Sequence, residues 1–545
     1  MKQGQTYLFR CVITTARRLI QILQTRYIAN VAELVRRNLR FFLLFTAAAL
    51  LLRLLFIFRF PAVVTDSFVY GDIAKNWLQH GIYGLSGPDE ISPTYIRLPG
   101  YPAFLAFIFA IFGMEHYRAV LFVQMFIDLG TCLLCADIAL RLLGPRFAKI
   151  AFVLACLCPF LADYSAAALT ETLEIFFTAL AFDLAIRALQ RDSMGCWAAC
   201  GAACAAAILL RPDGALLVMT FDLYLLARIL KPNLRNGVTA QPRRLWCNFQ
   251  AATLVTIIAI APLVPWAIRN WNVFHRLQPL APRYANEEDE FVPMGFNRWV
   301  KTWIADYSST EEIYWALPGT EIDSTKLPSR AFDSPRQQTE TAALINDYNQ
   351  DLHISPDLDT RFQALATERI HSHPVRYYLS LPLLRILDMW LRPRTEMLPC
   401  DTRWWEFNDD AIWSTLALGF GAINLGYFVC ALAGWMYARR IPLIGLLALF
   451  VILRSGFLGT LENPEPRYTL EMYPVVIVLA ACALGKMRRS TDRAGLISCS
   501  LRDESDLAQW RIAHAEARPH VFGEQGNRMT IGDRIHTREI PHGFH

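Results

Sequence analysis

The sequence predicts an all-α polytopic membrane protein. Of its 545 residues, 54% are hydrophobic and only 19% are charged, and the mean hydropathy is +0.27. These values lie outside the range of ordinary soluble domains. Apolar runs of the length that crosses a bilayer recur along the chain and predict about ten transmembrane helices. They lie near residues 41–60, 118–140, 150–165, 171–189, 196–211, 213–230, 248–268, 411–437, 441–460 and 470–486.

Basic side chains mark one end of these helices. They occur at every second junction, at 141–149, 187–191, 231–244, 439–440 and 486–489. Because basic residues concentrate in cytoplasmic loops, we expect both termini to be cytoplasmic. The first apolar run begins after Arg40, too late for a cleaved signal peptide. We therefore expect an uncleaved, multi-pass integral protein of a bacterial inner membrane.

The loops at the opposite ends face outward in this topology. They are the first loop, 61–117, the long segment 269–410 and the short loop 461–468. Two apolar stretches within them, 101–114 and 376–392, cannot cross if the count is kept, so they predict interfacial helices on the outer face. The tryptophans of the long segment indicate a small external domain rather than a disordered linker.

The chain is thus expected to have five parts. A cytosolic, basic amphipathic segment is followed by a transmembrane catalytic core, an external segment with an interfacial helix, C-terminal transmembrane helices and a polar cytosolic tail. Arginines between apolar positions at helical spacing in 8–37 predict a helix on the inner membrane surface. The expected bounds are 1–40, 41–270, 271–410, 411–487 and 488–545.

Five charged residues fall inside the predicted spans. A charge at mid-depth costs roughly 2.5–3.5 kcal/mol on insertion scales, so each is expected to have a partner. The residues are Arg53, Asp128, Asp137, Asp183 and Arg454. Similar depth leads to the hypothesis that Arg53 pairs with Asp128.

Other acids and arginines gather at the outer ends of the spans. A transporter would place its key charges near the middle of the membrane, on broken helices of repeated halves. The observed pattern instead suits an enzyme that acts on a lipid headgroup from outside. The residues are Asp66, Asp72, Arg97, Glu171, Arg211, Arg269, Glu462, Glu465 and Arg467.

Motifs at the same level resemble a known family. The first loop contains Asp66-x-x-x-Tyr70, Asn76 with His80-Gly81-x-Tyr83, and Arg97-x-Pro99-Gly100-Tyr101-Pro102. Later spans add Thr170-Glu171, Leu210-Arg211-Pro212, Pro265-Trp266 with Arg269, and Pro466-Arg467-Tyr468. Over roughly residues 41–487 the chain resembles the polyprenyl-phosphate-sugar-dependent glycosyltransferases of the C-type membrane superfamily. Protein O-mannosyltransferases and lipid A aminoarabinose transferases belong to it.

The resemblance implies a sugar donor on a polyprenyl monophosphate and a single displacement that inverts the sugar carbon. It also implies that a first-loop carboxylate, here Asp66, is the general base on the acceptor hydroxyl. Glu171 would support the site, and Asp72 is a further catalytic candidate. Arginine forks suit phosphate oxygens, so Arg97, Arg269 and Arg467 are the candidates for the donor phosphate. The candidates for other substrate contacts are Tyr70, His80, Tyr83, Tyr101 and Tyr468.

Several alternatives stay open. Asp66 and Glu171 could cap helices, and Arg97 could reach to lipid headgroups. No cofactor is required, but a divalent metal stays open because oligosaccharyltransferase-type relatives use one; Asp89-Glu90, the acidic pair of the first loop, looks like part of a turn.

The acceptor is also open. Protein O-mannosyltransferases have an adjacent Asp-Glu where Asp66 is followed by Ser67, so a glycan, lipid or protein acceptor all remain. Membrane lipids are expected partners and nucleic acid is not. The competing functions are a transporter or flippase of lipid-linked sugars and a membrane scaffold.

Overall fold

The computed structural model describes residues 30–230, 242–287, 289–407 and 411–487. The chain divides into one unit over Met1–Lys486 and another over Met487–His545, and nearly all described residues belong to the first. Three expected features lie wholly or mostly outside the described residues: the amphipathic helix of 8–37, the basic residues of 231–241 and the tail of 488–545.

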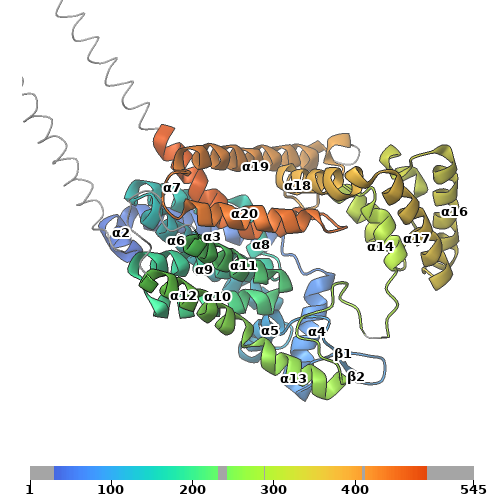
Figure 1. The fold of residues 1–545 in the computed structure, drawn as a ribbon, viewed down its shortest axis with the longest axis horizontal. Coiled ribbons are helices and arrows are strands. Elements are labelled where there is room, and N and C mark those ends of the chain that lie inside the picture. Colours follow the sequence, from blue (N-terminus) through green and yellow to red (C-terminus); the bar gives the residue numbers. More distant parts are fainter. Residues whose placement is uncertain (1–29, 231–241, 288, 408–410, 488–545) are drawn as a thin grey trace, which may run out of the picture. The chain divides into compact units, whose positions relative to one another are not determined.

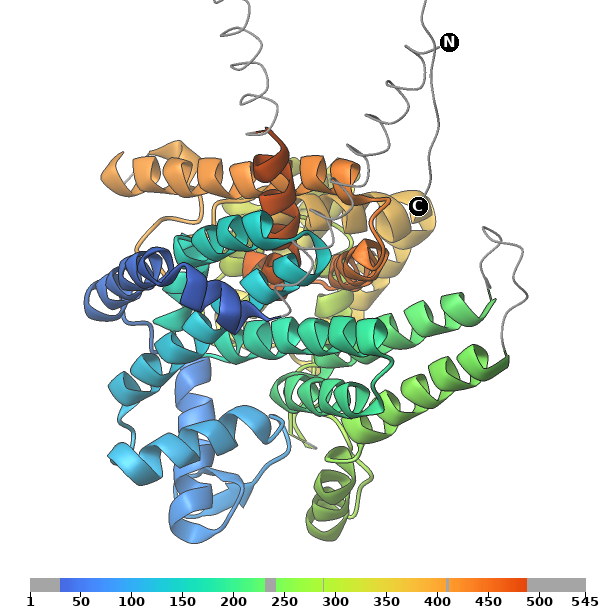
Figure 2. The same cartoon turned by 90° about the vertical axis from the view of Figure 1, so that its left-hand side faces the viewer.

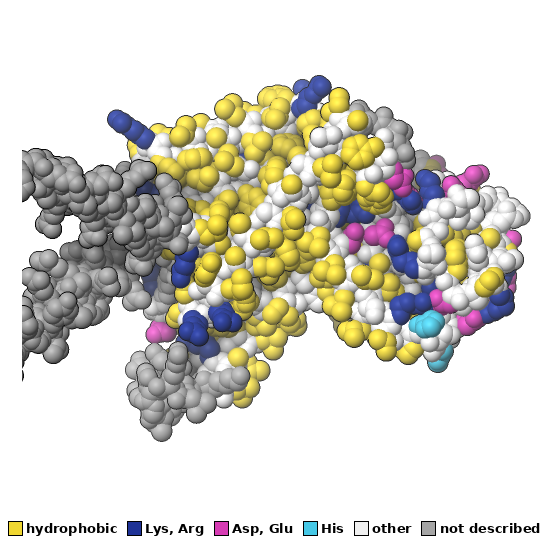
Figure 3. Space-filling view, turned by 90° about the horizontal axis from the view of Figure 1, so that it is seen from above, with side chains coloured by type: hydrophobic (Ala, Val, Ile, Leu, Met, Phe, Trp, Pro, Cys, Tyr) yellow, Lys and Arg dark blue, Asp and Glu magenta, His cyan; other side chains and the backbone are white. Residues whose placement is uncertain are grey.

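Helices make up most of the described chain (Figures 1 and 2). The bundle contains α2 (Val31–Arg37), α3 (Leu39–Arg59), α6 (Tyr117–Leu142), α7 (Pro145–Cys156), α8 (Pro159–Ser165), α9 (Glu171–Arg191), α10 (Met194–Leu210), η1 (Pro212–Gly214), α11 (Ala215–Leu230), α12 (Pro242–Ile260), α13 (Leu263–Phe274), α19 (Ala411–Ala438), α20 (Ile444–Gly459) and η7 (Pro466–Met472), which leads into a helix that ends at Met487. Figure 3 shows the wide apolar surface that these helices expose, as a lipid-facing bundle should.

Five of the described helices are long and apolar enough to cross a membrane, and the pair α7 and α8, bent by 51°, would make a sixth. They are Leu39–Arg59, Tyr117–Leu142, Leu245–Phe274, Ala411–Ala438 and Pro466–Met487. The other predicted spans are helices too, but α10, α11 and α20 have only 17, 16 and 16 residues and α9 carries several charges. The all-α, multi-pass membrane fold is confirmed, while about ten crossings require these shorter or charged helices to cross as well.

The pairing of Arg53 with Asp128 is confirmed. The Arg53 side chain is fully buried, and its Nε and Nη2 both lie 2.7 Å from Asp128 Oδ2. The same guanidinium donates to the carbonyl oxygens of Ala155 (3.1 Å) and Cys156, at the end of α7. Since the last carbonyls of a helix have no partner within it, Arg53 satisfies those exposed by the bend between α7 and α8.

The other charges within the bundle also have partners. Asp137 and Asp183 lie between Arg141 and Arg187, with nitrogen–oxygen distances of 2.6–3.1 Å. Arg454 is 2.9 Å from Asp213 and 3.0 Å from Glu471. Each charge is therefore neutralised locally, as the cost of burying it requires.

The first outer loop folds into α4 (Thr65–His80), the hairpin of β1 (Gly84–Ser86) and β2 (Ile91–Pro93), and α5 (Gly100–Phe112). Asp89 and Glu90 form part of its turn, as expected. Gly81 ends α4 with a positive φ of 70°, a conformation that glycine adopts without strain. Gly100 is needed for another reason: a Cβ there would lie 2.5 Å from the carbonyl oxygen of Leu209. Glycine thus lets α5 start against the end of α10.

The segment after α13 has a hydrophobic cluster of its own, although it belongs to the same compact unit as the bundle. Trp299 and Trp303 are fully buried in it, with Phe296 and Phe362. Figure 1 shows α14, α16 and α17 grouped beyond one end of the bundle helices, and the apolar helix α18 beside α20. The elements are α14 (Met294–Lys301), α15 (Tyr307–Ser309), η2 (Thr310–Tyr314), η3 (Ser324–Lys326), η4 (Ser329–Ala331), α16 (Pro335–Asp351), α17 (Pro356–Ser372), η5 (Arg376–Ser380), α18 (Leu381–Leu391) and η6 (Trp404–Glu406).

Candidate active site

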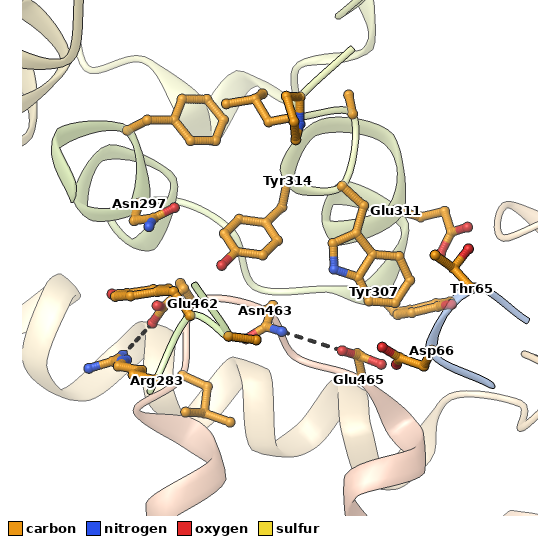
Figure 4. Close-up of a pocket in the computed structure, with 18 of the residues that line it drawn as sticks. Thr65, Asp66, Arg283, Asn297, Tyr307, Glu311, Tyr314, Glu462, Asn463 and Glu465 are labelled. Carbon is orange, nitrogen blue, oxygen red and sulfur yellow. Dashed lines mark hydrogen bonds and ion pairs between the residues drawn. The ribbon is translucent and has the colours of Figure 1, made fainter. Parts of the chain in front are cut away.

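A cavity of about 1440 Å³ lies between the outer ends of the bundle helices and the external segment. Figure 4 shows Asp66 and Glu465 on one wall, with Tyr307, Glu311 and Tyr314 of the external segment facing them. The wall thus combines the first loop, the loop before the last helix and the external segment. Sequence positions almost 400 residues apart meet there.

Asp66 projects from the first turn of α4 toward this cavity. Ser67, not Asp66, completes the helix start, because its Oγ accepts a hydrogen bond of 3.0 Å from the backbone N–H of Val64. The Asp66 side chain is 36% exposed, and its Oδ1 accepts a hydrogen bond of 2.9 Å from Arg97 Nη2. Its carboxylate is therefore available to a ligand and does not act as a helix cap.

A short backbone pairing holds Asp66 near Glu171. The N–H of Ala62 donates to the carbonyl of Ala166, and the N–H of Ala168 donates to the carbonyl of Ala62, both at 2.9 Å. The segment before α4 is thereby fixed beside the segment before α9. Asp66 and Glu171 stand four and three residues beyond this pairing.

Tyr101 supports the same backbone pairing through Gln124. Its hydroxyl donates to Gln124 Oε1 at 2.8 Å, and Gln124 Nε2 donates to the carbonyl of Ala167 at 2.6 Å. The Tyr101 side chain is fully buried and does not line the cavity. The structure therefore does not bring Tyr101 to the cavity, and its side chain positions the loop that carries Asp66. That Tyr101 contacts substrate stays a prediction.

Arg467 joins three carboxylates at the cavity wall. Its Nη2 is 3.8 Å from Asp66 Oδ2, its Nη1 is 3.6 Å from Glu171 Oε1, and its Nε is 2.5 Å from Glu465 Oε2. Arg467 follows Pro466 at the start of η7, which places it at the mouth of the last helix. The guanidinium is thus shared by the proposed base and two buried acids.

Arg97 approaches Asp66 from the other side. Its guanidinium lies 5.5 Å from the centre of the Tyr70 ring, and its carbonyl oxygen accepts a hydrogen bond of 2.9 Å from the Tyr83 hydroxyl. Tyr70 and Tyr83 are both buried and do not line the cavity. In the structure both side chains contact Arg97 and help to fix its position, and the substrate contacts expected of them stay predictions.

The acids and arginines continue inward as an alternating network. Glu171 Oε1 is 3.8 Å from Arg211 Nη1, whose Nε is 3.6 Å from Asp213. Asp213 in turn pairs with Arg454 at 2.9 Å. Arg211 and Asp213 also line the cavity, so the buried Glu171 connects two parts of its wall. The supporting role expected of Glu171 stays a prediction.

Two other first-loop candidates lie away from the cavity. Both carboxylate oxygens of Asp72 accept hydrogen bonds of 2.7 Å from Ser86, one from its backbone and one from its hydroxyl. Asp72 thereby ties α4 to the hairpin. His80 lies at the exposed end of α4 and does not line the cavity either.

Arg269 is also not brought to the cavity. Its Nη1 and Nη2 donate at 2.7 Å to the carbonyls of Thr94 and Tyr83, and Nη1 lies 2.9 Å from Asn270 Oδ1. The guanidinium thus braces the first loop against α13. That Arg269 binds the donor phosphate stays a prediction, which this arrangement does not support.

Tyr468, a predicted substrate contact, lines the cavity. Its hydroxyl donates to Glu465, and the guanidinium of Arg211 lies 4.7 Å from its ring centre. Glu465 accepts from Asn463 as well, at 3.3 Å, an interaction drawn in Figure 4. Glu465 was recognised only as an acid at the outer level; its adjacency to Arg467 in Glu465-Pro466-Arg467-Tyr468 was the available signal for a site residue.

Glu396 is a site residue that sequence reasoning missed. It lines the cavity in the irregular stretch between α18 and α19. Neither of its carboxylate oxygens has a hydrogen-bond partner among the described residues. Burial raises the pKa of Glu396 to about 7, although Arg394 and Arg467 oppose the rise. No motif or periodicity surrounds this position, so nothing in the sequence singled it out.

The described residues contain no group of three or more histidine, cysteine, aspartate or glutamate side chains placed to hold a metal ion. Two other acids, Glu171 and Glu465, share Arg467 with Asp66, and both form ion pairs with it. The donor set around Asp66 is therefore built of carboxylates with arginine partners. We derive no step through a metal.

Part of the chain matches a known family. Residues 93–266 match the family model described as dolichyl-phosphate-mannose-protein mannosyltransferase, a segment of about a third of the chain that starts after Asp66. The resemblance predicted from the motifs is thereby confirmed for this segment. No curated protein sequence matches the chain.

Solved structures show distant similarity. The archaeal oligosaccharyltransferase AglB from Archaeoglobus fulgidus, in complex with an inhibitory peptide and a dolichol-phosphate, matches with a TM-score of 0.43 and 12% identity over 84% of this chain. ArnT from Cupriavidus metallidurans, bound to undecaprenyl phosphate, matches with a TM-score of 0.36 and 14% identity over 83% of this chain and 79% of its own. The chain spans about half the length of the archaeal protein, 51%.

Proposed function

We propose that this protein is an integral membrane glycosyltransferase. It transfers a sugar from a polyprenyl-phosphate donor to an acceptor on the outer face of the membrane, with Asp66 as general base. The observation that carries the proposal is the position of Asp66 on the wall of the large cavity, between Arg97 at 2.9 Å and Arg467 at 3.8 Å. A carboxylate beside two phosphate-binding groups is what such a transfer needs.

The charges at the other helix ends support a cavity on the outer face of the membrane. Arg40, Arg141 and Arg191 lie at the ends of α3, α6 and α9 that are opposite to the cavity. At 1.5 Å per residue these helices separate the two levels by about 30 Å. Since basic ends are cytoplasmic, the cavity opens to the outer face.

The reaction is a single displacement. The oxygen of an acceptor hydroxyl attacks the anomeric carbon of the donor, Asp66 takes the hydroxyl proton, and the bond from that carbon to the phosphate oxygen breaks. The polyprenyl phosphate leaves with the electron pair of that bond, so the sugar carbon is inverted. Because the phosphate is a good leaving group without protonation, one carboxylate suffices, in contrast to the hydrolysis of ordinary glycosides.

Arg97 and Arg467 provide the positive charge for the leaving phosphate. A guanidinium has five N–H donors, so each can hold a phosphate oxygen while it still contacts Asp66. Positive charge aimed at the atom where negative charge develops is a large contributor to catalysis. The same contacts keep the base beside the bond that breaks.

The acceptor enters from the aqueous side, beneath the external segment. Tyr307 and Tyr314 form this part of the wall (Figure 4), and burial raises the pKa of Tyr307, which keeps it a neutral hydrogen-bonding group. A glycan, a lipid or a protein could present the hydroxyl. Polyprenyl donor and membrane lipids would approach from the apolar surface of the bundle.

The competing function is a transporter or flippase of lipid-linked sugars. It would need charges within the bundle that are free to engage the cargo. Arg53, Asp128 and Arg454 are instead neutralised by neighbours at 2.7–3.0 Å. This favours the enzyme.

The test uses the purified, detergent-solubilised protein with a panel of radiolabelled polyprenyl-phosphate sugars and crude envelope acceptors. We expect label to move from one donor class to an acceptor, with inversion at the sugar carbon. The control is the same reaction with Asp72→Asn, which changes an acid of the same helix outside the cavity and should retain transfer. Absence of transfer from every donor, together with donor movement across vesicle membranes, would refute the enzyme and support the flippase.

A further inference from the structure

Buried polar groups without partners collect behind the Asp66 end of the cavity. Among the described residues, both carboxylate oxygens of Glu396, both of Asp163 and the hydroxyl of Tyr164 are buried and have no hydrogen-bond partner. Asp163 and Tyr164 are each 1% exposed. Buried polar atoms are almost always satisfied, and each one left without a partner costs about 1–3 kcal/mol. Several together indicate a place where a polar ligand binds.

These groups form one cluster. The Glu396 carboxylate is close enough to Asp163, Tyr164 and Arg467 for their charges to interact. Glu396 faces the cavity, while Asp163 and Tyr164 lie behind it on α8 and do not line it. Arg467 connects the cluster to Asp66, at 3.8 Å. The cluster therefore begins where the reacting carbon of the donor would be.

The chemistry of the cluster restricts what it can hold. Above pH 7 the Glu396 carboxylate is ionised and only accepts hydrogen bonds, so the ligand group that faces it must donate them. Hydroxyl and ammonium groups do so, whereas a carboxylate or a phosphate would meet like charge.

We propose that Glu396 is the residue that recognises the ring of the transferred sugar. It accepts hydrogen bonds from ring substituents that are hydroxyl or amino groups, and it excludes sugars that carry an acid, such as uronic acids. This inference rests on the proposed transferase function and adds the substrate class to it.

A donor bound in the cavity would contact these residues in a fixed order. A donor phosphate between Arg97 and Arg467 would leave its sugar carbon beside Asp66 and its ring toward Glu396. The remaining cavity, under Tyr307 and Tyr314, is then free for the acceptor. Glu396 thus affects donor choice, and the external segment affects acceptor choice.

The experiment compares wild type, Glu396→Gln and Glu321→Gln. Glutamine keeps the shape of the side chain and removes its charge, and Glu321 is an exposed acid of the cavity rim that serves as the matched control. The donors are polyprenyl phosphates that carry a neutral hexose, an amino sugar or a uronic acid. KM and kcat are measured for each donor, and binding of polyprenyl phosphate without sugar is measured separately.

For Glu396→Gln we expect about a tenfold rise in the KM of the preferred donor, the loss typical of a hydrogen bond to a charged group, and about a tenfold fall in discrimination against the uronic acid. Binding of the sugar-free lipid should match wild type. In Glu321→Gln, which changes the acceptor side of the cavity, the KM values for the donors and the selectivity among them should match wild type. A purely structural role of Glu396 would change sugar-free binding as well. The relative rates of the hexose and amino-sugar donors show which of the two groups the subsite accepts.

Two results overturn the inference alone: unchanged donor selectivity in Glu396→Gln, or a wild type that uses the uronic acid donor as well as the neutral one. The second needs no variant, so it holds even if Glu396→Gln fails to fold. Absence of transfer by wild type from every donor overturns the proposed function, and this inference with it.

Discussion

The buried ion pair of Arg53 and Asp128 allows a quantitative prediction of stability. Replacing Asp128 by alanine leaves the guanidinium of Arg53, which is 0% exposed, without its counter-charge. Removing one partner of a buried pair costs about 3–5 kcal/mol because the other charge stays buried. Replacing Arg53 should cost a similar amount, since it also removes the hydrogen bonds to the carbonyls of Ala155 and Cys156.

The double variant distinguishes a true pair from two independent sites. Once both charges are absent, only the two carbonyls and the lost packing remain as costs. The variant that combines Arg53→Ala with Asp128→Ala should therefore be about as stable as the less stable of the two single variants, which corresponds to a coupling of about 3–5 kcal/mol.

The assay is reversible unfolding in mixed detergent micelles, with thermal denaturation in a single detergent as a second measure. Arg59→Ala, which changes an exposed residue at the end of the same helix, is the control and should change little. Additive losses in the double variant would refute the pairing as an energetic unit. Equal stability of Asp128→Ala and wild type would refute the argument from burial.

Three further predictions follow from the site and its supports. The folded state raises the pKa of Glu396 from 4.5 to about 7, so ionisation of Glu396 above pH 7 opposes folding by about 3 kcal/mol, a penalty that is absent below pH 4.5. The melting temperature of Glu396→Gln should therefore exceed that of wild type at pH 8 but not at pH 4. An equal gain at both pH values would contradict the burial of an ionised Glu396. Gly100→Ala should lower the melting temperature, because its Cβ would lie 2.5 Å from the carbonyl oxygen of Leu209. Gly426→Ala should not, because nothing lies within 4 Å of a Cβ at that position. Equal melting temperatures of the two variants would show that α5 can shift. Arg467→Lys should lower the rate of sugar transfer at least tenfold, because lysine cannot make the forked contacts of a guanidinium, while Arg269→Lys should mainly lower the melting temperature. If Arg269→Lys instead loses transfer and Arg467→Lys loses only stability, the catalytic and structural roles belong to the opposite residues.

Part of the site could be predicted because sequence patterns report depth in the membrane. Asp66, Arg97, Glu171 and Arg467 all stand at outer helix ends, and the structure brings them together. Arg53 and Asp128 stand at a common depth further in, and they pair. In each case the depth was read from the position of the residue within its apolar run.

Depth in the membrane does not show which helices are neighbours, and this explains why some candidate residues do not lie at the cavity and why one cavity residue was not predicted. Arg269 lies at the same level as Arg467, but α13 packs against the first-loop hairpin, where backbone carbonyls occupy its guanidinium. Tyr101 belongs to a specific motif, yet its side chain packs behind the cavity and holds the backbone that carries Asp66. Glu396 stands in an irregular stretch without period, and only tertiary structure takes it to the cavity.

The central claim is that Asp66 is the base of the sugar transfer. The most direct measurement is the rate of transfer by wild type and by Asp66→Asn, each with and without a chelator of divalent metals. Asparagine keeps the size of the side chain and cannot take the proton, so the account predicts loss of at least two orders of magnitude in rate, with donor binding retained and wild type unaffected by the chelator. Transfer by Asp66→Asn at the wild-type rate would contradict the account and remove Asp66 from the mechanism.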